Sequence, residues 1–225
     1  MKSYLHGLIL SVGIAISLSF FVQVASAGEI LVKSGQKIAF LGDSITAGGA
    51  RPGGYCRMVV DGLKNEGIEV SGIFAGKSGN KSNDMLARLD KAVISKKPAW
   101  MTLSCGVNDV WHFKLRLGKR TFKGVSLEDY KKNITSIIDQ TQAAGIKVMI
   151  LTSTMIGEDP ARELNQNLIP YNEFLRKIAQ EKKCLLVDLD KDMRAMLKTI
   201  PDVQGMPRIF GERQNKGTVK NKFFQ

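Results

Sequence analysis

Five short apolar runs recur along the chain, and between them apolar residues return at the spacing of a helix. The runs cover residues 37–41, 70–75, 100–105, 147–152 and 185–189. Strands of a parallel sheet are short and apolar because helices bury both of their faces. The pattern therefore predicts an α/β fold with a parallel sheet of about five strands.

The stretches between the runs carry their apolar residues on one helical face, and one of them also has signals at both ends. We expect helices at residues 55–65, 82–94, 127–144, 164–182 and 191–197. Ser126 followed by Asp129 resembles a capping box, and Gly145 is a typical helix stop. Ligands bind beyond the carboxyl ends of parallel strands. The loops in which we look for chemistry therefore follow Leu41, Ala75, Cys105 and Thr152.

The first 27 residues have the features of a targeting segment. Lys2 is their only charged residue, residues 7–24 are almost wholly apolar, and the segment ends in Ala25-Ser26-Ala27. This order predicts a signal peptide that is cleaved before Gly28, leaving a domain at residues 28–204 in the periplasm or outside the cell. The alternative is a retained membrane anchor. The small-x-small site favours cleavage, after which we expect no stable membrane insertion.

Length and composition fit one globular domain. The chain has 225 residues, of which 44% are hydrophobic and 24% charged, and this excludes a disordered or collagen-like chain. Lys and Arg outnumber Asp and Glu by 33 to 21, for a net charge of +12. Such a charge attracts polyanions but does not define chemistry. No nucleic-acid-binding motif accompanies it, so we expect no nucleic-acid partner.

The scarce reactive residues narrow the chemistry. His6 lies in the targeting segment, so His112 is the only histidine of the remaining chain. Cys56, Cys105 and Cys184 form no Cys-x-x-Cys pair, which leaves a zinc site or a thioredoxin-type motif without support. We expect these cysteines to be buried free thiols.

Three of the loops at predicted strand ends carry groups suited to acyl transfer. The loops contain Gly42-Asp43-Ser44-Ile45-Thr46, Gly76-Lys77-Ser78-Gly79-Asn80 and Gly106-Val107-Asn108-Asp109. A serine at a strand-to-helix turn exposes a hydroxyl that can act as a nucleophile. A glycine N–H and an asparagine amide can donate to a developing oxyanion. Each loop alone is also compatible with an ordinary turn or helix cap.

Together, these motifs resemble those of the SGNH or GDSL hydrolases, over about residues 37–197. The first motif is similar to the family block whose serine is the nucleophile, which implies that role for Ser44. Lys77-Ser78-Gly79, followed by Leu86-Ala87-Arg88-Leu89, is similar to the block whose glycine N–H lines the oxyanion hole, here Gly79. The third motif matches the block whose asparagine completes that hole, here Asn108. The resemblance implies a flavodoxin-like three-layer α/β/α sandwich.

The sequence departs from this family near its carboxyl end. The family's last block, Asp-x-x-His, supplies the catalytic base and its orienting acid, but no histidine follows His112, and Asp202 is followed by Val203-Gln204-Gly205. A serine without an adjacent base is a poor nucleophile. We therefore expect impaired activity, with His112 as a pocket residue or a substitute base.

Residues 205–225 also break the alternation of strands and helices. They hold five Lys or Arg and one acidic residue, and they end in Phe223-Phe224. We interpret them as an atypical basic tail, and a truncated or frame-shifted end is our hypothesis for its origin.

The remaining residues near the motifs are assigned more ordinary roles. Asp43 and Asp109 are expected to hold loops through backbone hydrogen bonds. Trp111 and Phe113 could form an apolar or sugar-stacking wall, although packing in the core is the commoner role of such residues. The segment from Gly72 to Ser78 is one residue too short for a phosphate-binding loop, so no nucleotide is expected.

The resemblance implies an exported ester hydrolase that uses no metal or organic cofactor. Its substrates would be acyl esters of small molecules or O-acetyl groups of polysaccharides. The alternative is a non-catalytic protein that binds an ester or a glycan on a hydrolase fold, and the missing histidine favours it.

Overall fold

The computed structural model describes residues 30–113, 116–117 and 120–199. The chain divides into two units, Met1–Leu31 and Val32–Gln225, and the second contains the fold described below. The expected signal peptide and the basic tail at residues 205–225 lie outside the described residues.

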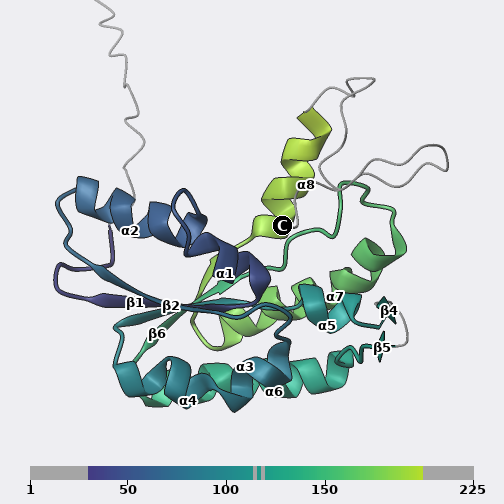
Figure 1. Ribbon diagram of the computed structural model, residues 1–225, viewed down its shortest axis with the longest axis horizontal. Helices are drawn as coiled ribbons and strands as arrows, with labels where there is room; N and C mark the ends of the chain where they lie inside the picture. Colours follow the sequence, from purple (N-terminus) through teal and green to yellow (C-terminus); the bar gives the residue numbers. More distant parts are fainter. Residues whose placement is uncertain (1–29, 114–115, 118–119, 200–225) are drawn as a thin grey trace, which may run out of the picture. The chain divides into compact units, whose positions relative to one another are not determined.

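Five parallel strands form the sheet, and they coincide with the five apolar runs (Figure 1). They are β1 (Lys37–Gly42), β2 (Ser71–Gly76), β3 (Trp100–Ser104), β6 (Lys147–Leu151) and β7 (Leu185–Val187). Their order across the sheet is β2-β1-β3-β6-β7. The predicted α/β class and its parallel sheet are confirmed.

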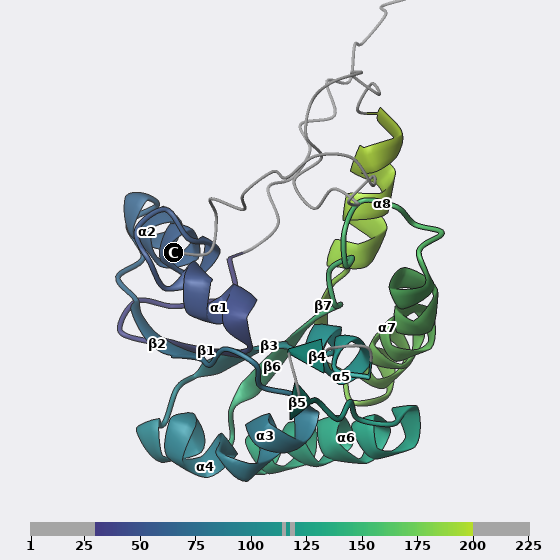
Figure 2. The ribbon, with the colours of Figure 1, turned by 45° about the vertical axis from the view of Figure 1, so that its right-hand side comes forward.

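Helices cover both faces of the sheet and complete the three-layer sandwich (Figure 2). One face carries α1 (Ser44–Gly49) and α2 (Tyr55–Asn65). The other carries α3 (Ser82–Ala87), α4 (Leu89–Ala92), the 3-10 turn η1 (Ile94–Lys96), α6 (Leu127–Ala143) and α7 (Glu163–Glu181). The remaining elements are α5 (Val107–Trp111), α8 (Leu189–Thr199) and a small hairpin of β4 (Arg116–Leu117) and β5 (Arg120–Thr121).

Alternate residues of the strands enter two separate apolar cores. In β1, Ala39 and Leu41 belong to the larger core under α6 and α7, whereas Ile38 and Phe40 belong to the smaller core under α2. This alternation follows from the two-residue repeat of a strand. Both faces of β1 are therefore buried, which fixes its register and the position of the loop that follows it.

The ends of α6 follow the expected signals. The Ser126 hydroxyl accepts a hydrogen bond from the Asp129 N–H at 3.1 Å, and Gly145 lies just beyond the helix at φ +75°. The helix expected at residues 82–94 is instead divided at Arg88, whose backbone (φ −111°, ψ 5°) ends α3 and precedes α4. Apolar spacing does not reveal such a break, because the apolar face continues across it.

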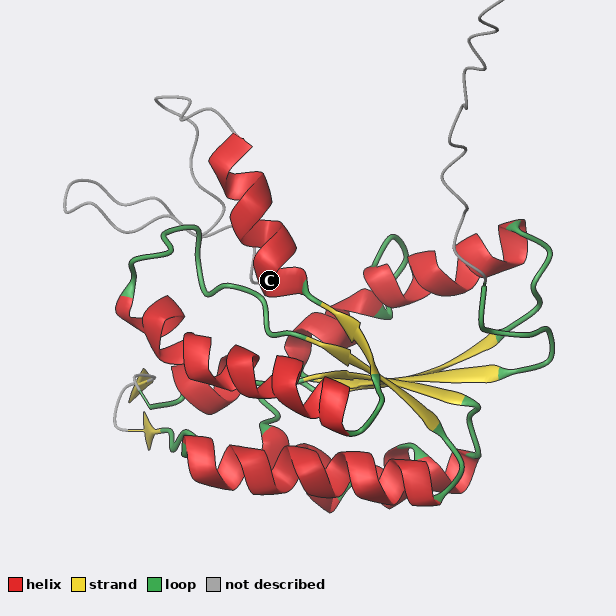
Figure 3. Cartoon of the chain, turned by 180° about the vertical axis from the view of Figure 1, so that it is seen from behind, coloured by secondary structure: helices red, strands yellow, loops and turns green. Residues whose placement is uncertain are grey.

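The edge of the sheet at β7 differs from its centre. The helix α8 follows β7 and projects from this edge (Figure 3). Leu185 and Leu186 on β7, and Met193 and Met196 on α8, are exposed. The core methionines Met85 and Met101 are fully buried and Met58, on α2, is exposed.

Among the described residues, no helix has both the length and the apolar character needed to cross a bilayer.

Candidate active site

Ser44 is the first residue of α1 and follows the carboxyl end of β1 directly. Its side chain is exposed. The preceding Asp43 caps the helix, since its carboxylate accepts a hydrogen bond from the Ile45 N–H at 2.9 Å. Burial raises the pKa of Asp43. This aspartate is therefore structural, as expected, and it fixes the turn that presents the Ser44 hydroxyl.

Two glycines allow α1 to lie against the strand ends. A Cβ atom on Gly42 would overlap the Thr46 side chain, and one on Gly76 would overlap the backbone nitrogen of Ala47. Any larger residue at Gly76 would push α1 away from β2. The close approach of helix and strand therefore depends on the absence of a side chain.

Gly79 occupies a tight turn after β2. The Asn80 N–H donates to the Lys77 carbonyl at 3.2 Å, and Gly79 adopts φ +77° between them, a conformation that glycine adopts without strain. The Lys77 N–H donates to the Gly42 carbonyl at 3.0 Å and joins this turn to the loop of Ser44. The Gly79 backbone is exposed.

Asn108 lies in the first turn of α5, after the carboxyl end of β3. Its side chain is buried, and its Nδ2 donates to the Asn80 carbonyl at 3.0 Å. Since an amide NH2 has two hydrogens, this bond orients the group and leaves the second hydrogen for a ligand. The three predicted site residues thus belong to neighbouring strand ends, and hydrogen bonds connect the loops that carry them.

Sequence reasoning missed two residues that join these loops. Asn80 accepts a 2.6 Å hydrogen bond from Arg88 Nε on its side-chain oxygen, in addition to the Asn108 bond on its carbonyl. Arg88 Nη2 also donates to the carbonyls of Gly42 at 3.0 Å and Ala75 at 2.9 Å. Arg88 stood within the second motif, but no pattern in the sequence showed where its side chain would reach.

Asp109 anchors α3 to α5, which confirms its expected structural role. Its Oδ1 accepts from the Ser82 N–H at 3.0 Å and from the Ser82 hydroxyl at 2.6 Å. Burial raises the pKa of Asp109 and that of the adjacent Cys105 thiol. Cys105 and Cys56 are buried free thiols as expected, whereas Cys184 is free but only partly buried.

His112 lies one helical turn after Asn108 and is 6% exposed. Its ring packs against Phe122 with the centroids 5.4 Å apart. Burial, together with the positive charge of Lys81, lowers the pKa of His112 and favours the neutral imidazole. Within the described part of the chain, His112 makes no hydrogen bond to Ser44.

Trp111 and Phe113 are 40% and 54% exposed. Trp111 is the last residue of α5 and Phe113 lies two residues beyond it. Both are exposed at this helix end, so the commoner role, packing in the core, does not apply to them. They remain available as an aromatic wall beside α5.

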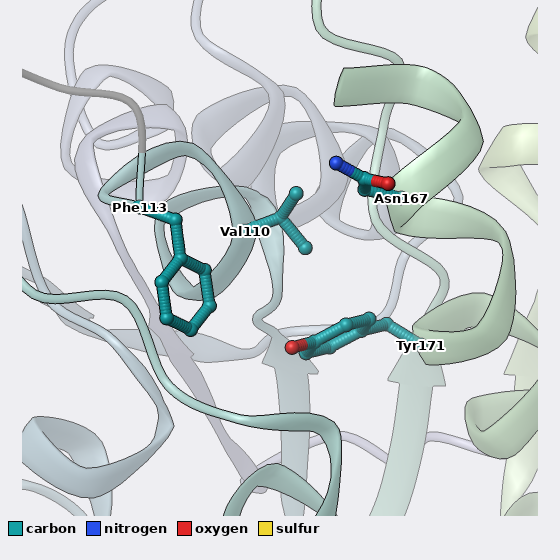
Figure 4. A pocket seen from close by; sticks show the side chains of 4 residues that line it. All are labelled: Val110, Phe113, Asn167 and Tyr171. Atoms are coloured by element: carbon teal, nitrogen blue, oxygen red, sulfur yellow. The ribbon is translucent and has the colours of Figure 1, made fainter. Parts of the chain in front are cut away.

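A pocket of about 260 Å³ lies between α5 and α7 (Figure 4). Val110, Phe113, Asn167 and Tyr171 line it. At 100° per residue, Val110 points to the side of α5 away from Asn108, and neither Ser44, Gly79 nor Asn108 lines the pocket. The pocket is thus separate from the oxyanion donors. In the described residues, no cluster of three or more His, Cys, Asp or Glu could hold a metal ion.

Comparison with known proteins identifies the family. The model of the GDSL-like Lipase/Acylhydrolase family matches residues 40–206. An acetylxylan esterase of Geobacillus stearothermophilus is 31% identical over 185 residues, which cover 75% of this chain and 83% of that protein. Esterase TesA of Pseudomonas aeruginosa is 25% identical over 198 residues, covering 87% and 84%.

Solved structures agree with this result. The crystal structure of Axe2, an acetylxylan esterase from Geobacillus stearothermophilus, superposes with a TM-score of 0.67 at 28% identity over 76% of this chain and 84% of that one. Catalytic mutants of Axe2 replace a serine, an aspartate and a histidine by alanine. The chain belongs to the GDSL-like lipase/acylhydrolase family, whose fold it shares, and it is a carboxylic ester hydrolase.

Proposed function

We propose that this hydrolase removes acetyl groups from carbohydrate, with Ser44 as the nucleophile. The observation that carries the proposal is the convergence of an exposed serine, a glycine turn and an oriented asparagine amide at three adjacent strand ends. The acetylxylan esterases among its relatives support the choice of acetyl ester. The exposed aromatic ring of Trp111, three residues after Asn108 on α5, suits contact with a sugar.

In this mechanism, Ser44 Oγ attacks the ester carbonyl and forms a tetrahedral intermediate. The N–H groups of Ser44 and Gly79 and the Asn108 amide would stabilise its oxyanion. The alcohol then leaves with a proton, and water hydrolyses the acetyl-enzyme to acetate and free serine. Donors held in place before the reaction need no reorganisation when the charge develops.

The proton transfers of this mechanism need a base beside Ser44. No histidine follows His112 in the sequence, whereas catalytic mutants of Axe2 include an aspartate and a histidine variant. We propose that turnover by this chain is slow. An oxyanion hole and binding without a complete triad retain about 10³-fold catalysis over water. His112 serves as a pocket residue in this proposal, since it packs on Phe122 rather than on Ser44.

We also propose that the protein is exported. The support lies in the sequence: one lysine, an apolar run over residues 7–24 and the Ala25-Ser26-Ala27 site. Mass spectrometry of the protein recovered from outside the cytoplasm should find Gly28 at the amino terminus. An amino terminus at Met1 would contradict cleavage.

A second candidate function is binding without turnover. The absence of a histidine after His112 favours it, because the oxyanion donors would still recognise an ester. One measurement separates the two functions. A hydrolase releases acetate at a rate that depends on Ser44, and a protein that only binds the ester does not.

Hydrolysis of p-nitrophenyl acetate by the chain, beside Ser44→Ala and His112→Ala, tests the proposal. We expect slow hydrolysis that disappears in Ser44→Ala and persists in His112→Ala. Acetylated xylo-oligosaccharides should then be preferred over p-nitrophenyl octanoate. Activity equal to that of folded Ser44→Ala would contradict the hydrolase mechanism and favour binding alone. Loss of activity in folded His112→Ala would assign the base to that residue.

A further inference from the structure

Arg88 occupies an unusual position for a cation near a site that stabilises negative charge. It is partly buried at the junction of α3 and α4, and its three hydrogen-bond partners are neutral oxygens. They are the Asn80 Oδ1 and the carbonyls of Gly42 and Ala75. Burial lowers the pKa of Arg88, as expected for a cation that has lost part of its water shell. Because burial of a cation is unfavourable, the hydrogen bonds of Arg88 must have a structural role that offsets the lost hydration.

The partners of Arg88 explain the arrangement. Gly42 ends β1 and precedes the turn of Ser44, while Ala75 lies at the end of β2 before the turn of Gly79. The planar guanidinium presents its N–H groups in a fixed fork, so it can bind both strand ends and a third oxygen together. One side chain therefore sets the spacing between the loops of the nucleophile and of the first oxyanion donor.

Asn80 extends this connection to the second oxyanion donor. Its side chain is held by Arg88, its N–H closes the turn around Gly79, and its carbonyl accepts from Asn108 Nδ2. Three of the four polar groups of Asn80 are thus used within the site. A shift of Asn80 would change the direction of the Asn108 amide and the shape of the Gly79 turn together.

We propose that Arg88, acting through Asn80, is the positioning residue that pre-forms the oxyanion hole. Arg88 does not contact the reacting atoms in this proposal. It fixes the donors, and displacement of a catalytic group by about 1 Å can cost about 100-fold in rate. The inference rests on the proposed function for its kinetic consequence, but the hydrogen bonds themselves can be tested without turnover.

Kinetics of Arg88→Met with p-nitrophenyl acetate give the first test. We expect kcat to fall about 10- to 100-fold with KM changed less than about twofold, because the oxyanion exists only in the transition state. Arg88→Lys, which keeps a cation but not the fork, should recover part of the loss. Lys91→Met, an exposed cation three residues later on α4, is the matched control and should retain the parental kcat.

A double-mutant cycle separates positioning from general stability. Asn108→Ala should lower kcat by about 10²- to 10³-fold. Adding Arg88→Met to it should lower kcat by a smaller factor than Arg88→Met does in the parent chain, since one of the donors that Arg88 positions is already gone. The proposal would be overturned if kcat of the double variant fell by the full product of the two single losses. It would also be overturned if folded Arg88→Met kept the parental kcat. If Arg88→Met does not fold, Asn80→Ala takes its place with the same expectations, because it removes the acceptor for Arg88 Nε and leaves the backbone N–H and carbonyl of Asn80 in place.

A spectroscopic readout covers the case in which the parent chain shows no turnover. The side-chain NH2 resonances of Asn108, identified by their loss in Asn108→Ala, should shift or broaden in Arg88→Met and stay in place in Lys91→Met. Resonances unmoved in folded Arg88→Met would overturn the positioning role. A shift in an inactive parent would support it while contradicting the hydrolase mechanism, so the two failures are distinguishable.

Discussion

The two halves of the sheet hold their carboxyl ends together by different means. At β1, β2 and β3, the loops meet through close glycine contacts, through the hydrogen bonds of Arg88 to neutral oxygens, and through the buried Asp109 carboxylate, which accepts from the neutral Ser82. At β6 and β7, charged pairs dominate. Arg176 contacts Asp188 at 2.8 Å and Asp190 at 2.9 Å, and Arg194 contacts Asp190 at 2.8 Å.

This difference shows two ways of building the same edge. The hydrogen bonds from Arg88 to backbone carbonyls do not depend on carboxylate protonation, and their distances and directions fix the positions of the loops. The charged pairs attach α8, whose only buried residue is Asp190, at a place with few apolar contacts. We therefore expect that a change of shape disrupts the half of the sheet edge at β1, β2 and β3. In the charged half at β6 and β7, we expect protonation of the carboxylates to detach α8.

Gly76→Ala should produce the largest effect, in the half governed by geometry. The new methyl group would overlap the Ala47 backbone nitrogen, which cannot move without shifting α1 and Ser44. We expect a loss of about 3 kcal/mol in the free energy of unfolding and at least about a 100-fold fall in kcat. Urea unfolding and p-nitrophenyl acetate hydrolysis measure the two.

Gly62→Ala is the matched control for that substitution. Gly62 lies in α2 and its added Cβ would contact nothing within 4 Å. Alanine should raise stability by up to about 1 kcal/mol, since glycine is a poor helix former. Equal effects of Gly76→Ala and Gly62→Ala would remove the case for a tight contact between α1 and β2.

Asp188→Asn should have the next largest effect, in the charged half. The hydrogen bond from Arg176 holds the pKa of Asp188 below its ordinary value. Stability from this carboxylate is therefore present above the unfolded pKa of about 4 and is lost as pH falls through the lower, folded pKa. We expect a loss of about 2 kcal/mol at pH 7 that shrinks in acid, measured by urea unfolding across pH.

Asp192→Asn on the exposed side of α8 provides the comparison. It should change the free energy of unfolding at pH 7 by less than about 0.5 kcal/mol, as is usual for an exposed position. Parallel pH profiles of the parent chain and Asp188→Asn would show that the charged pairs do not hold α8.

Ser126→Ala should give the smallest effect and sets the scale of an ordinary local interaction. It removes the hydroxyl that accepts from the Asp129 N–H at the start of α6, a loss of about 1 kcal/mol. We expect kcat to be unaffected, because the hydrogen bonds of the Ser126 hydroxyl go to Asp129 in the first turn of its own helix and not to the loops that carry Ser44, Gly79 and Asn108. Thermal unfolding followed by circular dichroism measures it, and a change in kcat would argue against the separation.

Much of the fold was predictable because burial leaves a periodic signal. The five strands and the long helices α6 and α7 repeat their apolar residues often enough to define a face. The short helices α1 and α5 were not predicted, since five or six residues with glycine or asparagine carry no period. Their position follows from packing against strand ends, which only the folded chain provides.

The candidate site divides in the same way. Ser44, Gly79 and Asn108 were found because each follows a strand end and matches a motif. Their roles stay predictions. The hydrogen bonds of Asn80 and Arg88 join residues 8 to 46 positions apart, and the sequence has no signal for such pairs. The exposure of Trp111 was also missed, because an aromatic residue beside an apolar one predicts burial in most folds.

Methionine oxidation can measure how often the core of this protein opens, because its methionines differ in exposure. Met58 and Met196 are each 64% exposed, whereas Met85 and Met101 are fully buried. Mild peroxide should convert the first pair to sulfoxide at once and reach the second pair only when the core opens. The ratio of the two, read by mass spectrometry, then reports how often each variant unfolds, without a denaturant and at any pH.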